Sequence, residues 1–264
     1  MAVTTQVNDV PLHTVTYGIR TTTFGTSIAR SIMVADLAQN FAACPPDARI
    51  EDYTLAAIDE NVLGKRTASA RRLGFRNLCE FYALNRKTLI FRVLRDLWDA
   101  DSEAQPMLAL LCATARDPIL RAVAPFVLAL PPGTLVTPAM ISEESERKFP
   151  GKFNPSSLHS LGRSAASSFE QAGLLFGKRD KERTRPDVRP TSVAFALLLG
   201  DLCGSRGRGL CGTLWARMLD APEPVLREVA VSASRQGWIE YRSSDDVIDV
   251  SFRHLMREDW EVRA

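Results

Sequence analysis

The sequence predicts a mainly α-helical protein of two domains, with helix-turn-helix or winged-helix-like units and short β-hairpin wings. The first observation is that apolar residues recur at helical spacing along most of the 264-residue chain. The second is a layout that occurs twice, in which a helix ends at a glutamine and a glycine and is followed by an apolar strand and a polar hairpin. A helix that is closed by a left-handed glycine and followed by a two-stranded ribbon is how a winged helix ends.

A proline-rich turn, Pro131–Pro132–Gly133, marks the predicted boundary between the two domains. Residues 1–130 are expected to form an N-terminal helical bundle with a helix-turn-helix-like segment, and residues 131–264 a C-terminal winged-helix-like domain. With 45% hydrophobic and 24% charged residues, the chain can bury one large core or two smaller ones.

In the first half, residues 1–24 show no firm periodicity and are expected to form an arm or a short strand region. Apolar spacing then predicts a helix from Thr26 to the Pro45–Pro46 pair, where proline ends it. Asp52 is expected to cap a second helix, and Thr67 a third after a short turn. Further helices are predicted over residues 87–98, 103–115 and 118–128.

In the second half, Thr137 and Pro138 are expected to start a helix that ends at Arg147, and Ser156 a helix that ends at Ala172. The second helix leads into the first strand and hairpin of the repeated layout. Helices are then predicted over residues 192–203, 210–219 and 225–235, before the final hairpin.

Composition restricts the classes of partner. Net charge is only +2, so any binding of anions must come from local basic clusters and not from a global field. Five cysteines without CxxC spacing favour reduced thiols. The longest apolar run, residues 122–130, is far short of a membrane span, and the N-terminus lacks the apolar core of a signal peptide. We therefore expect a soluble, cytoplasmic protein without a membrane partner.

The first basic cluster follows the predicted turn between the second and third helices, in a stretch without any acidic residue. Its members are Lys65, Arg66, Arg71, Arg72 and Arg76. Because residues four apart share a helix face, Arg72 and Arg76 are expected to present a phosphate-contacting surface. The helix N-terminus adds free backbone amides and a positive dipole end. The alternative is a solvated helix face without a partner.

The second basic cluster lies in the polar hairpin of the first repeated unit, where acidic residues partly offset it. The DNA contacts expected here are Arg163 on the preceding serine-rich helix and Lys178, Arg179, Lys181, Arg183 and Arg185 on the wing. The alternative is a disordered charged loop. The final hairpin carries Asp245, Asp246 and Asp249, so we expect it to pack internally or to contact protein.

Catalytic signals are weak. The three histidines are far apart and have neither metal-ligand nor nucleophile-activating spacing. Gly207, Gly209 and Gly212 spell GxGxxG, but they follow a predicted helix and not a buried strand, so a helix–helix turn is expected. We therefore expect no enzyme, no catalytic residue, no metal and no cofactor.

Two short motifs carry a family resemblance. The first motif is residues 61–72, NVLGKRTASARR, which look like the pattern N-L-L-x-x-R-T-x-S-x-x-R. The second is residues 171–175, QAGLL, followed by Arg189–Pro190, and it looks like the pattern E-A-G-L-L with a later proline. Both patterns are those of BrxA proteins, components of bacteriophage exclusion (BREX) systems, which this chain resembles over roughly residues 26–200. The resemblance implies a small, helix-rich DNA-binding protein without known catalysis.

These observations predict a non-catalytic accessory protein of a BREX-type anti-phage defence system. It is expected to bind double-stranded DNA mainly through phosphate-directed arginine and lysine, with other BREX subunits as further candidate partners. Two alternatives stay open: a protein-interaction adaptor within a multi-subunit defence complex, and an RNA-binding protein.

Overall fold

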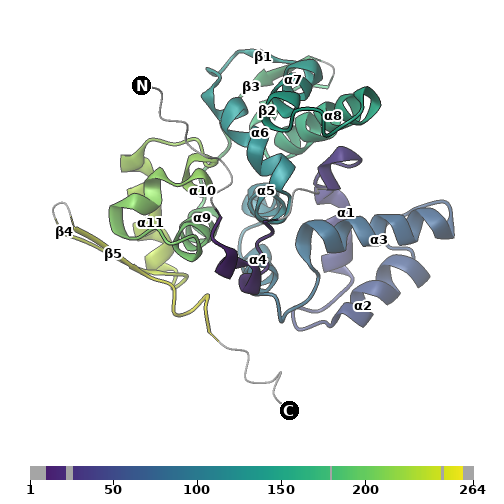
Figure 1. The fold of residues 1–264 in the computed structure, drawn as a ribbon. Helices are drawn as coiled ribbons and strands as arrows, with labels where there is room; N and C mark the ends of the chain where they lie inside the picture. Colours follow the sequence, from purple (N-terminus) through teal and green to yellow (C-terminus); the bar gives the residue numbers. More distant parts are fainter. Residues whose placement is uncertain (1–9, 22–25, 179, 245–246, 258–264) are drawn as a thin grey trace.

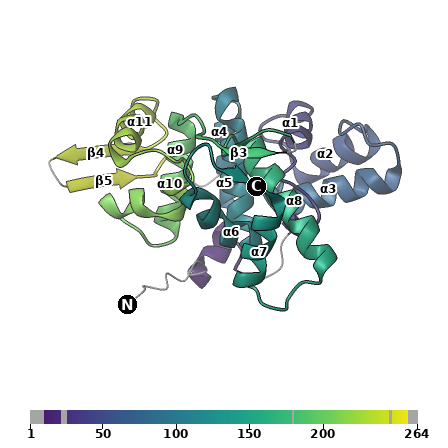
Figure 2. The ribbon, with the colours of Figure 1, turned by 90° about the horizontal axis from the view of Figure 1, so that it is seen from above.

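The computed structural model describes residues 10–21, 26–178, 180–244 and 247–257. Within these ranges the chain is mainly helical, with small antiparallel sheets, as the sequence predicts. Figures 1 and 2 show α4, α5 and α6 between an end of the molecule that contains α1 to α3 and an end that contains α9 to α11. The middle helices are α4 (Leu89–Trp98), α5 (Gln105–Arg116) and α6 (Pro118–Ala129).

The first end contains α1 (Val34–Ala42), α2 (Ile50–Thr54), a π-helical turn η3 (Leu55–Asp59) and α3 (Ala68–Tyr82). The predicted cap of α3 is confirmed, since the Thr67 hydroxyl accepts a hydrogen bond from the Ala70 amide at 3.1 Å. Asp52 instead lies inside the first turn of α2, where its carboxylate accepts from the Arg49 amide at 2.8 Å.

The single helix predicted from Thr26 is wrong, because the chain breaks into η2 (Thr26–Ile28) and α1. Met33 has φ 54°, a left-handed conformation that interrupts a helix. Two amides in this break donate to side chains of α8 (Pro155–Gln171). The Ile32 amide donates to Ser168 Oγ at 3.1 Å, and the Val34 amide donates to Gln171 Oε1 at 3.0 Å. Another helix thus satisfies amides that a continuous helix would have satisfied itself.

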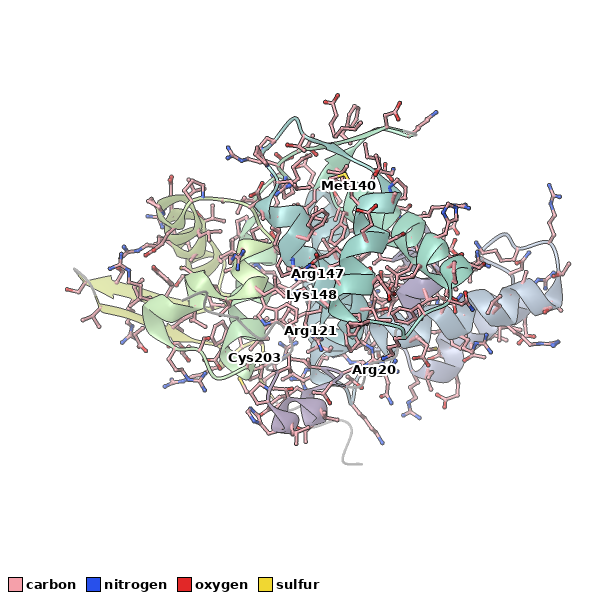
Figure 3. The ribbon with its side chains drawn as sticks, turned by 45° about the horizontal axis from the view of Figure 1, so that its top comes forward. Arg20, Arg121, Met140, Arg147, Lys148 and Cys203 are labelled. Carbon is pink, nitrogen blue, oxygen red and sulfur yellow. The ribbon has the colours of Figure 1, made fainter. Side chains whose placement is uncertain are left out.

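Buried charged groups fix the N-terminal segment, which also contains the unpredicted 3-10 helix η1 (Leu12–Tyr17), to the middle helices. Arg121 donates to the carbonyls of Ala115 at 3.0 Å and Arg20 at 2.7 Å; Figure 3 labels both arginines. The Asp117 carboxylate, which caps α6, accepts from the Ser27 amide at 2.8 Å. Charge-assisted bonds of this kind hold the segment in one position.

A three-stranded antiparallel sheet is formed by strands that come before α7 (Pro138–Lys148) and after α8 in the chain. It contains β1 (Leu135–Val136), β2 (Leu175–Phe176) and β3 (Lys181–Arg183) in the order β1-β3-β2, and it packs on α8 through β2. Successive strand residues point to opposite faces, so Val136, Leu175, Lys181 and Arg183 are buried. The opposite face exposes Leu135, Phe176 and Glu182. Strand β1 was not predicted from the sequence.

Gly162 permits a close crossing of α7 and α8. A Cβ at this position would lie 2.2 Å from the Pro138 oxygen and 2.3 Å from Ser142 Oγ. Gly162→Ala is therefore expected to lower the free energy of unfolding by about 2 to 3 kcal/mol through overpacking. Urea unfolding followed by circular dichroism measures this effect. Gly209→Ala is the control because a Cβ there meets no atom within 4 Å; equal midpoints for the two variants would contradict the prediction.

The other end contains the second repeated unit, and both units close in the same way. Its elements are α9 (Pro190–Leu202), η5 (Gly207–Gly212), α10 (Leu214–Arg217), α11 (Glu223–Arg235), β4 (Glu240–Ser244) and β5 (Val247–Ser251). Gly173 and Gly237 have φ 78° and 83°, and a two-stranded hairpin follows each. The GxGxxG glycines form η5 between two helices, which agrees with the predicted helix–helix connection.

One contiguous hydrophobic core contains buried residues from both halves, including Leu37, Leu111, Phe195 and Leu226. Helix α9 packs on α4 and α5, and α6 packs on α7. The domain boundary after residue 130 therefore stays a prediction. No helix in the described ranges has the length and apolar character to cross a membrane.

All five cysteines are free, and two lie in helices of the core. Burial raises the pKa of Cys79 to about 11 and that of Cys112 to about 12. At pH 8 the thiolate fractions are about 1 in 1,000 and 1 in 10,000, so both residues should react with iodoacetamide only after unfolding. Mass spectrometry with and without urea tests this; rapid labelling of Cys112 in the folded protein would contradict it.

Candidate nucleic-acid interface

Three of the five cations in the first basic cluster are available to a ligand. Arg66, Arg72 and Arg76 are exposed, Arg66 directly before the Thr67 cap of α3 and the other two on the helix. Among the described residues, no acidic side chain forms an ion pair with any of them. The sequence from Asn61 to Cys79 contains no acidic residue. The structure therefore places one guanidinium group just before the cap of α3 and two more on the helix, at its fifth and ninth residues, without an acidic partner among the described residues.

The other two cations of this cluster stabilise the fold. Lys65 Nζ lies 2.8 Å from a carboxylate oxygen of Asp36 on α1. Arg71 donates to the Ile58 carbonyl at 3.2 Å and is half-buried. These contacts attach the start of α3 to α1 and η3. The expectation that all five cations face a ligand is therefore corrected for Lys65 and Arg71.

Two of the predicted wing contacts are buried, and this too corrects the expectation. Lys181 Nζ donates to the Gly177 carbonyl at 2.9 Å. Arg183 is 1% exposed and donates to the Val127 carbonyl at 3.0 Å. Its second guanidinium nitrogen lies 2.9 Å from Asp220, in the connection between α10 and α11. The reason is the alternation of β3, which turns Lys181 and Arg183 toward the core and Glu182 toward solvent.

The remaining predicted contacts lie on the wing and on α8. Lys178 is exposed between β2 and β3, while Arg179 lies outside the described residues. Arg185 is exposed, although its Nε is 3.6 Å from Asp220. Arg163 is exposed on α8. The wing thus retains Lys178 and Arg185 as exposed members of the predicted set.

The outward face of α8 is polar and is connected to the N-terminal segment. The Asn154 side chain caps the helix, accepting from the Ser157 amide at 2.8 Å. Arg163, Ser167 and Gln171 are spaced four residues apart and therefore share one face. Gln171 Nε2 donates to Ser167 Oγ at 3.2 Å and to Ser31 Oγ at 2.9 Å.

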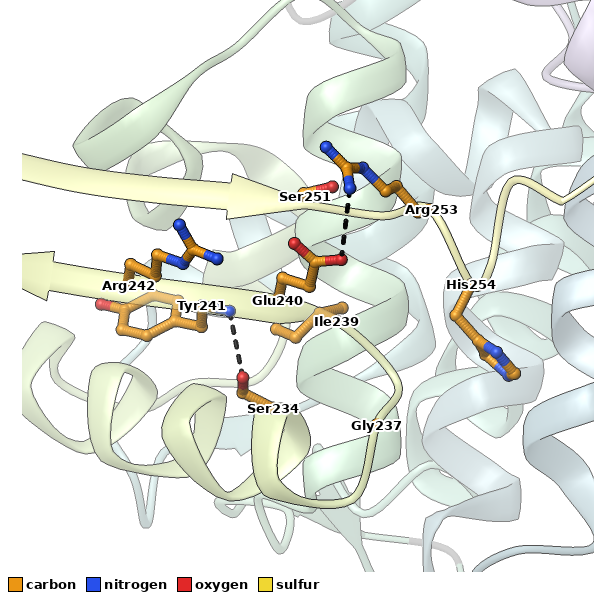
Figure 4. A pocket seen from close by; sticks show the side chains of 9 residues that line it. All are labelled: Ser234, Gly237, Ile239, Glu240, Tyr241, Arg242, Ser251, Arg253 and His254. Carbon is orange, nitrogen blue, oxygen red and sulfur yellow. Dashed lines mark hydrogen bonds and ion pairs between the residues drawn. The ribbon is translucent and has the colours of Figure 1, made fainter.

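A pocket of about 290 Å³ lies at the base of the β4–β5 hairpin (Figure 4). Its lining includes Glu240 and Arg253, which approach to 4.0 Å, and Ser234, whose Oγ accepts from the Tyr241 amide at 3.1 Å. The bond to Ser234 joins the hairpin to the end of α11, and the approach of Glu240 and Arg253 joins β4 to the chain after β5. Asp249 is exposed on β5, while Asp245 and Asp246 lie outside the described residues.

The described residues contain no group of three or more histidine, cysteine or acidic side chains that could hold a metal ion. No protein-family model matches the sequence, and no curated protein matches it. Function is therefore inferred from the exposed cations and their positions in the fold.

Proposed function

We propose that this protein binds double-stranded DNA without catalysing a reaction, and that Arg66, Arg72 and Arg76 are its principal phosphate contacts. One observation supports this most: these exposed arginines have no acidic partner among the described residues and lie on or just before α3. Guanidinium groups bind phosphate oxygens through paired, charge-assisted hydrogen bonds. Each neutralised phosphate also releases counterions, which gives salt-dependent affinity.

The elements around α3 support this use. Helix α2 with η3, the turn near Gly64 and α3 follow one another as in a helix-turn-helix, in which the second helix presents its N-terminal residues to DNA. Gly64 and Asn61 have φ 62° and 56°, and the Asn61 side chain accepts from the Lys65 amide at 2.9 Å. These contacts hold the turn that directs Arg66 outward.

We also propose that the chain contains two winged-helix units. The first would be α6-β1-α7-α8-β2-β3, and its sheet order β1-β3-β2 supports this assignment. The second would be α9-η5-α10-α11-β4-β5, with η5 in place of the first strand; a Cβ on Gly207 of η5 would lie 3.0 Å from the Ile248 oxygen of β5. Helix α8 then has the position of a recognition helix.

The cellular role we propose is that of an accessory protein in BREX-type anti-phage defence. The resemblance of residues 61–72 and 171–175 to BrxA motifs supports it. In this role the protein would work in the cytoplasm with other BREX subunits. A plaque assay in a host that carries the whole defence locus, with and without this gene, tests the role.

Fluorescence anisotropy with a labelled 30-base-pair duplex, a single strand and a structured RNA, each in a salt series, tests DNA binding. We expect the duplex to bind more tightly than the single strand or the RNA. The logarithm of its association constant K should fall linearly with the logarithm of the salt concentration, at a slope of about −2.7 or steeper, because each of three phosphate contacts adds about 0.9. No binding of the duplex at low salt would reject the proposal. Stronger binding of the RNA would instead favour an RNA-binding role.

A protein-interaction adaptor is the second candidate function, and the outward face of the three-stranded sheet favours it. Leu135 and Phe176 are 49% and 75% exposed, and both are cross-strand neighbours of the exposed Glu182. This face fits a protein segment with a cationic side chain between apolar ones. Binding to a subunit encoded by a neighbouring gene that is lost in Phe176→Ser, without binding of any nucleic acid, would support the adaptor.

A further inference from the structure

The outward faces of α8 and α3 both end at the N-terminal segment, α8 at residues 26–34 and α3 at Arg20. On α8, the face that carries Arg163 reaches Ser31 through Gln171, whose Nε2 donates to Ser31 Oγ at 2.9 Å. On α3, Arg72, Arg76 and Glu80 are spaced four residues apart and share one face. Glu80 forms an ion pair with Arg20 at the beginning of the segment.

The segment is held on both sides of Arg30. Before it, the Ser27 amide and hydroxyl donate to Asp117 at 2.8 and 3.0 Å. After it, the Ile32 amide donates to Ser168 of α8 at 3.1 Å, and the Ile32 carbonyl accepts from the Tyr82 hydroxyl of α3. Helices α8 and α3 both contact η2. Arg30 is exposed at this junction.

The charges along this path are mainly cationic, and each acidic side chain on the two faces is paired with a cation. Residues 21–29 carry no charged side chain, so Arg30 is the next charge after Arg20. Glu80 is an acidic side chain on the α3 face, and Arg20 neutralises it. Glu170, seven residues after Arg163 on the α8 face, lies 3.6 Å from Lys181 Nζ. The other charged members of the two faces are Arg72, Arg76 and Arg163. A polyanion that lies across both helices would therefore meet cations at α3, at the junction and at α8.

We infer that α3 and α8 contact the same DNA duplex, and that Arg30 between them is a further phosphate contact. This inference rests on the proposed DNA binding and assigns the duplex to one continuous surface instead of two separate patches. Because Ser27 and Ile32 are both held by buried groups, the backbone that carries Arg30 is already ordered, and binding has little conformational entropy to remove there.

Single substitutions test the inference with the 30-base-pair duplex. Arg30→Ala and Arg163→Ala should each weaken binding roughly 5- to 10-fold at 0.1 M salt and reduce the slope of log K against log salt by about 0.9. Arg30→Lys keeps the positive charge, so its affinity for the duplex should be close to that of the wild type. Arg217→Ala is the control, since Arg217 is exposed on α10 at the other end of the molecule.

A combined α3 variant, in which Arg66, Arg72 and Arg76 are all replaced with alanine, completes the test. If Arg30→Ala and Arg163→Ala bind the duplex as tightly as Arg217→Ala does, while the combined α3 variant loses affinity, the shared surface is wrong and DNA binding through α3 stands. If the combined α3 variant also binds the duplex with wild-type affinity, the proposal that α3 is the DNA site is rejected. The melting temperature of each variant shows whether a loss of affinity comes from a missing contact or from an unfolded protein.

Discussion

Replacement of Arg66, Arg72 and Arg76 together with alanine is expected to weaken duplex binding roughly 100-fold at 0.1 M salt. The three side chains are exposed and lack acidic partners among the described residues, so their removal should leave the fold intact while three phosphate contacts disappear. The slope of log K against log salt should become shallower by about 2.7, at 0.9 for each contact. Anisotropy titrations in a salt series measure both quantities.

A control variant must change net charge equally. Arg217, Arg235 and Arg242 are also exposed but lie on the α10, α11 and β4 end of the molecule. Both triple variants reduce the net charge of +2 by three, to −1. The control should retain most of the wild-type affinity, because it changes the overall charge by the same amount but removes no proposed DNA contact. Equal losses in the two variants would mean that α3 is not a specific site.

Replacement of Arg183 with alanine is expected to lower the free energy of unfolding by roughly 3 to 5 kcal/mol, which is the range for breaking a buried ion pair. Arg183 is 1% exposed and joins three parts of the chain: it donates to the Val127 carbonyl of α6 and the Leu174 carbonyl, and pairs with Asp220 at 2.9 Å. Its loss leaves the carboxylate and both carbonyls without these donors. Calorimetry should show Tm lower by roughly 10 °C.

Arg185→Ala is the matched control, because Arg185 also faces Asp220, at 3.6 Å, but is 66% exposed. Solvent screens an exposed pair, so this change should cost less than about 1 kcal/mol. An Arg183→Ala variant as stable as Arg185→Ala would show that the buried pair does not hold the two units together.

Much of the fold follows from local sequence. The Thr67 cap, the helices of the middle bundle and the glycines that close α8 and α11 depend on spacing and on residues within a few positions of each other, so the sequence predicted them. The break at residues 29–33 was missed because the groups that cause it, Ser168 and Gln171, are more than 130 residues away in the sequence.

For the candidate site, the sequence located the basic helix but could not separate the cations that face solvent without an acidic partner from those that contact the fold. Lys65 and Arg71 belong to the same basic cluster as Arg66 and Arg72. In the structure, however, Lys65 pairs with Asp36 and Arg71 donates to the Ile58 carbonyl. Arg30 was absent from the predicted set, since it was placed inside a continuous helix. Only the position of each neighbour in space distinguishes a free guanidinium from a structural one.

The sequence by itself determined the helical class, the repeated helix–glycine–hairpin layout and the acid-free arginine run, because periodicity and capping act over short distances. Tertiary structure alone decided the two-residue strand β1, the burial of Lys181 and Arg183, and the contacts of α3 and α8 with Ser31 and Ile32, next to Arg30. Burial and ion pairing depend on which distant segments come together, and the desolvation of a charge next to its partner is a property of that assembly, not of the local chain.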